Sequence, residues 1–515
     1  MIKYTSNRQI AIEEFKTPFR FGLDKNNRWV RMANEIFWDD LVNIYSRSLC
    51  RDFGRPSVSP RVVIGALIIK HLLGLSDEET IETIRENPYC QYFLGYEEFS
   101  HEVPFDASLF VYIRRRLGQE EFNEMTDALI SQVEEKRKSG KSGKGHSVKD
   151  SSSSGKKRKS NIQGDDHVEE RPDETSGSSE DTNANNHQGM LILDATVAPA
   201  DIKYPTDLDL LNTAREKREQ LIDILYKPAP GKVKPRTYRR VAHKAYLSIA
   251  KKRKKNKKAI RKQLNYLGRH IRTIHKLLDA YPQMPLSHQA LREFWIIQEL
   301  YRQQLQMYEQ KTHQISHRIV SISQPHVRPI VRGKAGKAVE FGAQVSVSYV
   351  KGYVYVDRIS WESYHEGEDL VKQVEEYRRR FGCYPEVVVA DKKYGCRDNR
   401  QYLKSKGIRF SGKPLGRPPK ELNKLIKEER RRLKEEARQR VKIEGKFGQG
   451  KRGYDLGLVK AKLPQSGASW ICVVFFVMNV VKWLFLLFHN WRIWAIYLYK
   501  SLILAPAKSI EMAPL

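Results

Sequence analysis

Residues 338–360, AVEFGAQVSVSYVKGYVYVDRIS, alternate between apolar and polar side chains on the N-terminal side of a Lys-Gly pair. Val345, Val347 and Tyr349 are each separated from the next by a polar residue. A period of two residues is typical of a β-strand that buries one face. The pair at 351–352 fits a two-residue turn that leads into a second strand, YVYVDRIS, because glycine tolerates the positive φ that such turns require. The stretch therefore predicts an antiparallel β-hairpin.

Apolar stretches on either side of this hairpin predict further strands. Residues 190–193, MLIL, end in Asp194, and residues 386–390, EVVVA, end in Asp391. Helical stretches and a short strand, IRFSG, follow the second of these. When residues 207–325 are set aside, three antiparallel strands are followed by alternating helices and strands. This order predicts an α/β fold, a mixed sheet with helices on its faces.

The other segments are predicted from their composition and period. Residues 1–134 are expected to be helical, and Ser59-Pro60 marks the start of one long apolar helix. Short helices around a glycine turn fit a helix-turn-helix-like DNA-binding unit, and they fit a plain helical bundle equally well. Residues 135–188 have almost nothing to bury and predict a disordered linker. Residues 207–325 predict a basic helical insertion whose Lys and Arg residues favour a DNA-backbone surface.

The overall composition indicates a polyanionic partner and a reducing compartment. The chain has 92 Lys and Arg against 61 Asp and Glu, a net charge of +31, which favours nucleic acid or an anionic surface. Its 5 cysteines include no CxxC pair, which argues against a structural zinc site and a disulfide framework. The N-terminal residues contain no apolar signal-peptide core. We expect a cytoplasmic protein.

Residues 470–488, WICVVFFVMNVVKWLFLLF, approach the length of a membrane span. Five polar residues interrupt this region and its continuation, and on a helix they fall on less than half of the circumference. They are Asn479, Lys482, His489, Asn490 and Arg492. A polar stripe on an apolar helix is typical of a helix packed against a domain. We therefore expect no membrane insertion.

Three acidic residues stand out as candidates for chemistry. An aspartate at the end of a buried strand is unexplained by packing, and both Asp194 and Asp391 occupy such positions. Glu444 lies on a later, highly charged helix within RQRVKIEGKFGQGKRGYD, residues 438–455. If the strands are neighbours, these carboxylates form a cluster that only a cation can neutralise. Hard oxygen ligands of this kind suit Mg²⁺ or Mn²⁺.

Four of these stretches carry a resemblance to a known family. LILDAT, GYVYVDRISWESYHEG, VVADKKYG and RQRVKIEGKFGQGKRGYDLG resemble the DDE transposases of bacterial insertion sequences. The last stretch is similar to the family's C-terminal signature of Tyr, Arg, Glu and Lys, with Arg440, Glu444 and Lys451 at the family's intervals. Ala437 stands where the family has the tyrosine. FGRPSVSPRVVIGALIIKHLLGLSDEET and PFDASLFVYIRRRLG resemble the helical domain of the same transposases.

The resemblance implies a ribonuclease-H-like catalytic core over residues 189–490, with a tail at 491–515. Asp194, Asp391 and Glu444 would bind two divalent ions. The activity would be DNA cleavage at element ends followed by attack of the freed 3′-hydroxyl on target DNA. The partners would be double-stranded DNA and further copies of the chain, in association with the nucleoid.

Basic residues near the glutamate and in the helical domain are the candidates for binding DNA. If the helix continues through residue 451, Arg440, Glu444 and Lys451 lie within roughly 60° of one another. One helix face would then combine a metal ligand with two phosphate-binding cations, although Gly445, Gly448 and Gly450 weaken that helix. The full set of candidates is Arg440, Lys446, Lys451, Arg452, Arg114, Arg115 and Arg116.

Three other interpretations remain at the level of sequence. The first is a ribonuclease-H-like nuclease without strand transfer, and the second is a catalytically inactive DNA-binding regulatory derivative. The third is a membrane-associated basic protein. Asp201, Asp357 and Asp369 also lie in segments expected to be ordered, and a structural pairing with Arg358 or a neighbouring strand is the expected role of Asp357.

Overall fold

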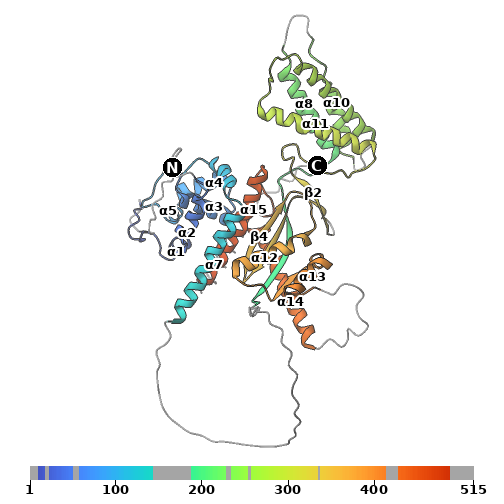
Figure 1. Ribbon diagram of the computed structural model, residues 1–515. Coiled ribbons are helices and arrows are strands. Elements are labelled where there is room, and N and C mark those ends of the chain that lie inside the picture. Colours follow the sequence, from blue (N-terminus) through green and yellow to red (C-terminus); the bar gives the residue numbers. More distant parts are fainter. Residues whose placement is uncertain are drawn as a thin grey trace, which may run out of the picture.

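The structure is a computed structural model (Figure 1). The residues that it describes are 10–17, 22–49, 57–142, 187–227, 233–252, 257–334, 337–412 and 427–487. Most of the expected linker and all of the expected tail at 491–515 lie outside these ranges.

A 6-stranded mixed sheet forms the centre of the protein (Figure 1). Its strands are β1 (Met190–Pro199), β2 (Arg328–Lys334), β3 (Lys337–Val350), β4 (Tyr353–Ser360), β5 (Val387–Ala390) and β6 (Arg409–Phe410). β1 lies between β3, which is antiparallel to it, and β5, which is parallel, and β6 follows β5 in parallel. β4 and β2 pair with different parts of the long β3. This mixed sheet agrees with a ribonuclease-H-like catalytic domain, and β2 is the strand that the sequence pattern did not predict.

The predicted hairpin is present as β3 and β4. Val350 pairs with Tyr353, and Lys351 and Gly352 form the turn with φ of 51° and 97°. Both central residues therefore have the positive φ of the turn type that matches strand twist. The apolar Val345 and Val347 face the core and are fully buried. The hairpin prediction is confirmed.

β1 is longer than expected. The strand was expected to end at Asp194, and instead it continues to Pro199 because its pairing with β3 extends to Gly342. A side chain at Gly342 would collide with the backbone of this strand, since its Cβ would lie 2.1 Å from the Ala198 carbonyl oxygen. Glycine thus permits the close approach that prolongs the strand. Asp194 is an internal strand residue.

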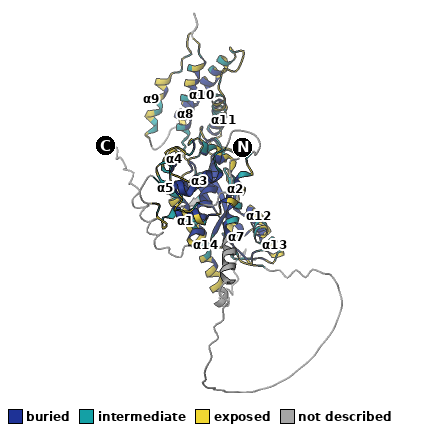
Figure 2. Cartoon of the chain, turned by 90° about the vertical axis from the view of Figure 1, so that its left-hand side faces the viewer, coloured by how far each residue is buried: buried dark blue, intermediate teal, exposed yellow. Residues whose placement is uncertain are grey.

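The N-terminal part is helical as expected. Its helices are α1 (Arg28–Glu35), α2 (Trp38–Ser46), α3 (Pro60–Leu73), α4 (Asp77–Glu86), α5 (Pro88–Leu94), α6 (Leu109–Arg116) and α7 (Gln119–Ser142). α3 begins at Pro60, as predicted, and is the deeply buried helix at the centre of this part (Figure 2). α7 extends through Ser142, so the start of the expected linker is helical.

The insertion between β1 and β2 forms a lobe of its own, which stands beyond one end of the sheet in Figure 1. It consists of α8 (Asp207–Leu225), α9 (Arg239–Ala250), α10 (Lys257–Leu278) and α11 (His288–Glu309). Two apolar clusters hold it together, one around Leu211, Leu267 and Ile297 and the other around Ile222 and Ile274. The large core of the rest of the protein is a separate cluster.

Three further helices follow the hairpin in the chain. They are α12 (Leu370–Phe381), α13 (Arg397–Ser405) and α14 (Lys427–Gly453). α12 packs on β1, and α14 packs on β1 and β5. The alternation of helices and strands after the hairpin is therefore as predicted.

The apolar stretch forms α15 (Pro464–Leu487), which is long and apolar enough to cross a membrane but is mostly buried in the protein. It packs against α3, α6 and α7 on one side and β4 on the other. Asn479 donates to the Val354 carbonyl oxygen at 2.7 Å and accepts from the Val354 N–H at 2.9 Å. Its amide thus satisfies the open edge of β4. The apolar stretch is therefore a helix packed within the protein, as the polar stripe in its sequence predicts.

Candidate active site

The parallel pairing of β1 and β5 places two of the candidate acids side by side. Leu193 is opposite Ala390 in the register, so Asp194 and Asp391 are the next residues on neighbouring strands. Each carboxylate accepts the N–H of the following residue, from Ala195 at 2.8 Å and from Lys392 at 2.7 Å. These local bonds hold both side chains on one side of the strand pair, at the edge where β5 ends beside β1.

The helix α14 brings the third acid to this edge. The helix continues through Gly453 despite its glycines, so Arg440, Glu444 and Lys451 share the face that the sequence predicted. Arg440 lies between two carboxylates: its Nη2 is 3.0 Å from Glu444 Oε1, and its Nη1 is 3.8 Å from Asp391 Oδ1. Ile443 and Phe447 on the same helix are buried and fix it to the core.

The electrostatics of Asp194 reflect this crowding. Burial is the main cause that raises the pKa of Asp194 to about 6. The negative charges of Glu366 and Glu444 raise this pKa further, while the Ala195 N–H and Arg440 lower it. A carboxyl group with a raised pKa beside other carboxyl groups is typical of a functional site. Asp194 is half-buried, whereas the side chains of Asp391 and Glu444 are 45% and 49% exposed.

Glu366 is a fourth acid that the sequence reasoning missed. It is 6% exposed, and its carboxylate receives Lys393 Nζ at 3.4 Å and Gln344 Nε2 at 3.4 Å. Lys393 follows Asp391 closely in VVADKKYG, so Glu366 is tied to the same edge. Its only signal in the sequence is its place in the loop YHEGED, after the hairpin.

Asp357 has the structural role expected of it, with partners on a neighbouring strand and a helix. Its Oδ2 accepts from Ser348 Oγ of β3 at 2.6 Å and from Gln373 Nε2 of α12 at 2.7 Å. Arg358 pairs with Asp369 instead, at 3.0 Å. Neither aspartate is grouped with Asp194.

The donor set suits a hard divalent cation, although a basic side chain lies within it. Within the described parts of the chain, no three Asp, Glu, His or Cys side chains stand close enough together to hold a metal ion. Arg440 supplies the positive charge that the carboxylates need in this arrangement. Carboxylate oxygens are the ligand type that Mg²⁺ and Mn²⁺ prefer, but in this structure a guanidinium lies between two of the carboxylates.

The candidate DNA-binding residues of α14 point in two directions. Arg440 and Lys451 share the face of Glu444, and the exposed Arg452 adjoins it. Lys446 lies on the opposite face, where burial, together with the charge of Lys482 on α15, lowers its pKa to about 8. Lys446 is therefore not part of the carboxylate site.

The arginine cluster of α6 is also divided. Arg114 is 5% exposed and makes two bonds to Asp77, at 2.9 and 2.6 Å, so it is engaged in holding α6 to α4. Arg115 and Arg116 are exposed at the end of the helix. The exposed face of α4 carries acidic side chains, Glu78, Glu79, Glu82 and Glu86. That face is unsuited to contact phosphates.

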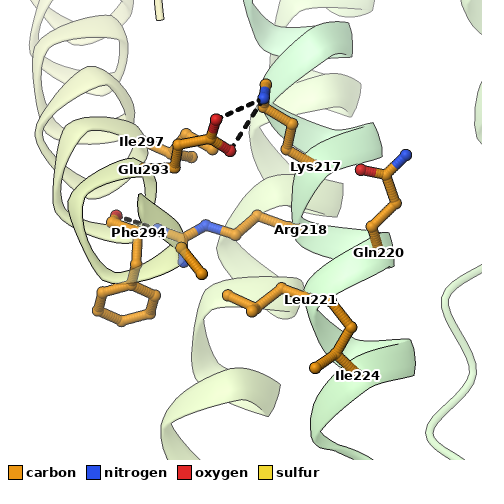
Figure 3. Close-up of a pocket in the computed structure, with 9 residues that line it drawn as sticks. Lys217, Arg218, Gln220, Leu221, Ile224, Glu293, Phe294 and Ile297 are labelled. Atoms are coloured by element: carbon orange, nitrogen blue, oxygen red, sulfur yellow. Dashed lines mark hydrogen bonds and ion pairs between the residues drawn. The ribbon is translucent and has the colours of Figure 1, made fainter. Parts of the chain in front are cut away.

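A small hollow between α8 and α11 lies in the insertion, away from the carboxylates (Figure 3). Arg218 crosses it, stacks on the Phe294 ring at 4.2 Å and donates to the Phe294 carbonyl oxygen at 2.5 Å. Lys217 pairs with Glu293 at 2.9 Å at its rim. These contacts join α8 to α11 and account for the buried arginine structurally.

Two protein families match the chain, in separate segments. The transposase DDE domain family matches residues 388–481, which include Asp391, Glu444 and most of α15. A second transposase domain family (DUF772) matches residues 19–116, which include α1 to α6. The second match covers the helical N-terminal part, and the first covers the second half of the catalytic part.

One relative is the uncharacterized protein ORF8 in the nfe locus of Rhizobium meliloti. It is 39% identical over 101 residues, which are 20% of this chain and 48% of that protein. The match thus spans about half the length of the relative. No solved structure matches the chain. Both matching families are transposase domains, and the first match includes Asp391 and Glu444, so these two segments of the chain are similar to transposase domains.

Proposed function

We propose that the protein cleaves DNA at the ends of an insertion sequence and transfers the freed 3′-hydroxyl to target DNA. The observation that carries this proposal is the placement of Asp194 and Asp391 on adjacent strands with Glu444 facing them from α14. The transposase families that match the chain support the same activity.

Asp194, Asp391 and Glu444 are the proposed ligands of two Mg²⁺ or Mn²⁺ ions. When bound, the ions would activate the attacking oxygen and stabilise the leaving oxygen of a phosphodiester. The negative charge of Glu366 raises the pKa of Asp194. The Lys393 ammonium, 3.4 Å from the Glu366 carboxylate, offsets part of that negative charge.

The chain's own basic groups would position the DNA at this site. Arg440 and Lys451 flank Glu444 on one face of α14, and Arg452 extends that face. Arginine pairs well with phosphate oxygens, which fixes the scissile group relative to the carboxylates. The exposed Arg115 and Arg116 of the helical part are proposed to contact the DNA backbone at a second place.

The proposed reaction has two balanced steps. In the first, a water oxygen bonds to phosphorus and the 3′-oxygen of the element end leaves, taking up a proton. In the second, this 3′-oxygen bonds to a target phosphorus and displaces the target's own 3′-oxygen, which takes the proton. Because two element ends must meet one target, we propose a homo-oligomer on DNA, in the cytoplasm and associated with the nucleoid.

Strand cleavage and joining on terminal inverted-repeat DNA with Mg²⁺ test the proposal. Glu444→Ala is expected to lower both activities by about a hundredfold or more, since even a residue that only supports a metal ligand contributes about 10–100-fold. Glu435→Ala is the matched control, because Glu435 is an exposed acid on the same helix that pairs with Arg438. Equal activity of Glu444→Ala and wild type would refute the carboxylate assignment. Cleavage without joining by the wild type would identify a nuclease instead.

A further inference from the structure

Among the described helices that contain no Asp or Glu, α10 has the most Lys and Arg residues. Its sequence, KKAIRKQLNYLGRHIRTIHKLL, contains seven Lys or Arg residues and no Asp or Glu. An amphipathic surface helix ordinarily mixes both signs of charge on its polar face. The one-sided charge of α10 therefore calls for an anionic partner outside the helix.

The seven cations occupy one face of α10. At about 100° per residue they fall within roughly 140° of the circumference. All of them are exposed: Lys257, Lys258, Arg261, Lys262, Arg269, Arg272 and Lys276. The opposite face buries Leu264, Leu267 and Ile274 against the rest of the insertion. The helix is thus fixed on its apolar side, and the basic face points to solvent.

Five of the seven cations on this face have no acidic partner on a described neighbouring element. Among the residues that the structure describes, Lys257, Arg261, Lys262, Arg272 and Lys276 form no ion pair. Exposed cations elsewhere commonly have an acid nearby, as Arg85 has Glu82 at 2.5 Å and Arg302 has Glu299 at 2.6 Å.

Arg269 in the middle of the face is held in place by aromatic rings. Its guanidinium carbon is 5.1 Å from the centre of the Tyr238 ring and 4.8 Å from that of Tyr266. These contacts restrict the side chain, so less conformational entropy is lost when it binds a phosphate. Tyr238 directly precedes α9. Arg236 before that helix and Arg240 in its first turn are also exposed and continue the positive surface.

We propose that this face of α10 binds the phosphate backbone of duplex DNA without regard to sequence. The face, from Lys257 to Lys276, is about 29 Å long at 1.5 Å per residue. DNA presents one phosphate per roughly 1.7 Å of its axis, so the face meets enough phosphates for every cation. Asn265 is the one exposed amide on the basic arc, which leaves little for reading base edges.

The inference rests on the proposed function for the identity of the polyanion and adds a second contact to it. The insertion forms a lobe apart from the sheet (Figure 1), and the carboxylates lie where α14 packs on β1 and β5. DNA on α10 is therefore DNA at a distance from the cleaved bond. Such a contact would retain flanking or target DNA while the element end occupies the active site.

Duplex DNA fits this face better than a membrane surface does. A helix that lies on a membrane must turn its apolar face towards the lipid. In α10 that face is covered by α8 and α11. The exposed side of α10 carries the cations, which are the groups that contact a DNA backbone.

The test compares how tightly the wild type and an α10 variant bind a random-sequence duplex of roughly 30 base pairs, about 100 Å long. Binding is measured by fluorescence anisotropy without divalent metal. The variant carries Arg261→Gln, Lys262→Gln, Arg272→Gln and Lys276→Gln in the full chain. We expect its affinity to fall on the order of tenfold or more at low salt. We also expect the slope of log K against log salt to become shallower by about 3 to 4, since each lost phosphate contact removes about 0.9.

A charge-matched control separates this effect from loss of net charge. It carries Lys25→Gln, Arg47→Gln, Arg85→Gln and Arg302→Gln, four exposed cations that already pair with acids. This control should keep nearly the wild-type affinity and slope. Equal losses in both variants would overturn the proposal, and so would unchanged binding by the α10 variant when circular dichroism shows both to be folded.

Two further measurements complete the test. If the wild type bound anionic vesicles and the α10 variant lost this binding as much as it lost DNA binding, the face would attract anions in general. That result would overturn the assignment to DNA. Cleavage of short end DNA at saturating concentration should be unchanged in the α10 variant. If the wild type bound random duplex through α10 but never cleaved end DNA, the proposed function would fail while the α10 contact stood.

Discussion

At the scale of single residues, Arg440 is the side chain with the sharpest consequence. Its guanidinium lies between Glu444 at 3.0 Å and Asp391 at 3.8 Å, two of the proposed metal ligands. A divalent ion at this place must displace that guanidinium from its carboxylates. An exposed ion pair of this kind contributes about 1 kcal/mol at most, which corresponds to about fivefold in affinity.

We therefore predict that Arg440→Gln binds Mn²⁺ about fivefold more tightly than wild type, in isothermal titration or by electron paramagnetic resonance. Its cleavage activity should fall nevertheless, because a phosphate-positioning cation is lost. Arg438→Gln removes an exposed cation of the same helix that pairs with Glu435, and it should change neither quantity. Weaker Mn²⁺ binding by Arg440→Gln would contradict this competition.

At the scale of elements, Asp357 ties α12 to the sheet and gives that contact a pH dependence. Burial raises the pKa of Asp357 to about 6, against the hydrogen bonds of Ser348 and Gln373, which lower it. In the unfolded chain the carboxyl ionises near its usual pKa of 3.8. The ionised form is thus disfavoured in the folded state, and the free energy of unfolding falls as pH rises from about 4 to about 6.

The size of this loss is about 3 kcal/mol, since each unit of pKa shift corresponds to about 1.4 kcal/mol. We predict that Asp357→Asn removes the loss, so the variant gains on wild type by about that amount between pH 4 and pH 7. Urea unfolding at several pH values measures it. Asp398→Asn, at an exposed acid of α13, is the control. A parallel pH dependence of Asp357→Asn and wild type would refute the assignment.

Elements also differ in how far the sequence could predict them. The hairpin follows from local alternation and a Lys-Gly turn, and both are properties of the chain itself. The length of β1 depends on its partner, because Gly342 on another strand permits the pairing beyond Asp194. β2, RPIVRGK, has no alternating run long enough to predict. The helix α14 persists through three glycines because Ile443 and Phe447 are buried on the sheet.

The candidate site shows the same division. Asp194, Asp391 and Glu444 could be predicted because each follows or lies in a recognisable element. Glu366 could not, because its place near Asp194 depends on the fold of a loop. Arg114 and Lys446 were expected to bind DNA, yet Arg114 is bonded to Asp77, and Lys446 lies on the face of α14 opposite to Glu444, near the positive charge of Lys482.

At the scale of the whole molecule, the N-terminal helices and the central sheet share one core. A single apolar cluster extends from Trp29 in α1 through α15 to the strands, whereas the insertion has clusters of its own. Asn479 of α15 joins the two parts, because its amide bonds both β4 at Val354 and Thr126 of α7 at 3.2 Å. Cooperative unfolding follows shared burial, so this division predicts two unfolding units.

We predict two thermal transitions in calorimetry, one for the insertion and one for the helices and sheet together. Asn479→Leu leaves the Val354 N–H and carbonyl without their side-chain partner, which costs about 2 kcal/mol or more. It should lower the second transition and leave the first unchanged, and hydrogen exchange should locate the loss of protection in α7, α15 and β4. Asn43→Leu, at an exposed asparagine of α2, controls for the change of side chain. A shift of both transitions by Asn479→Leu would contradict this division, because an insertion that unfolds independently of the core cannot respond to the loss of a bond within the core.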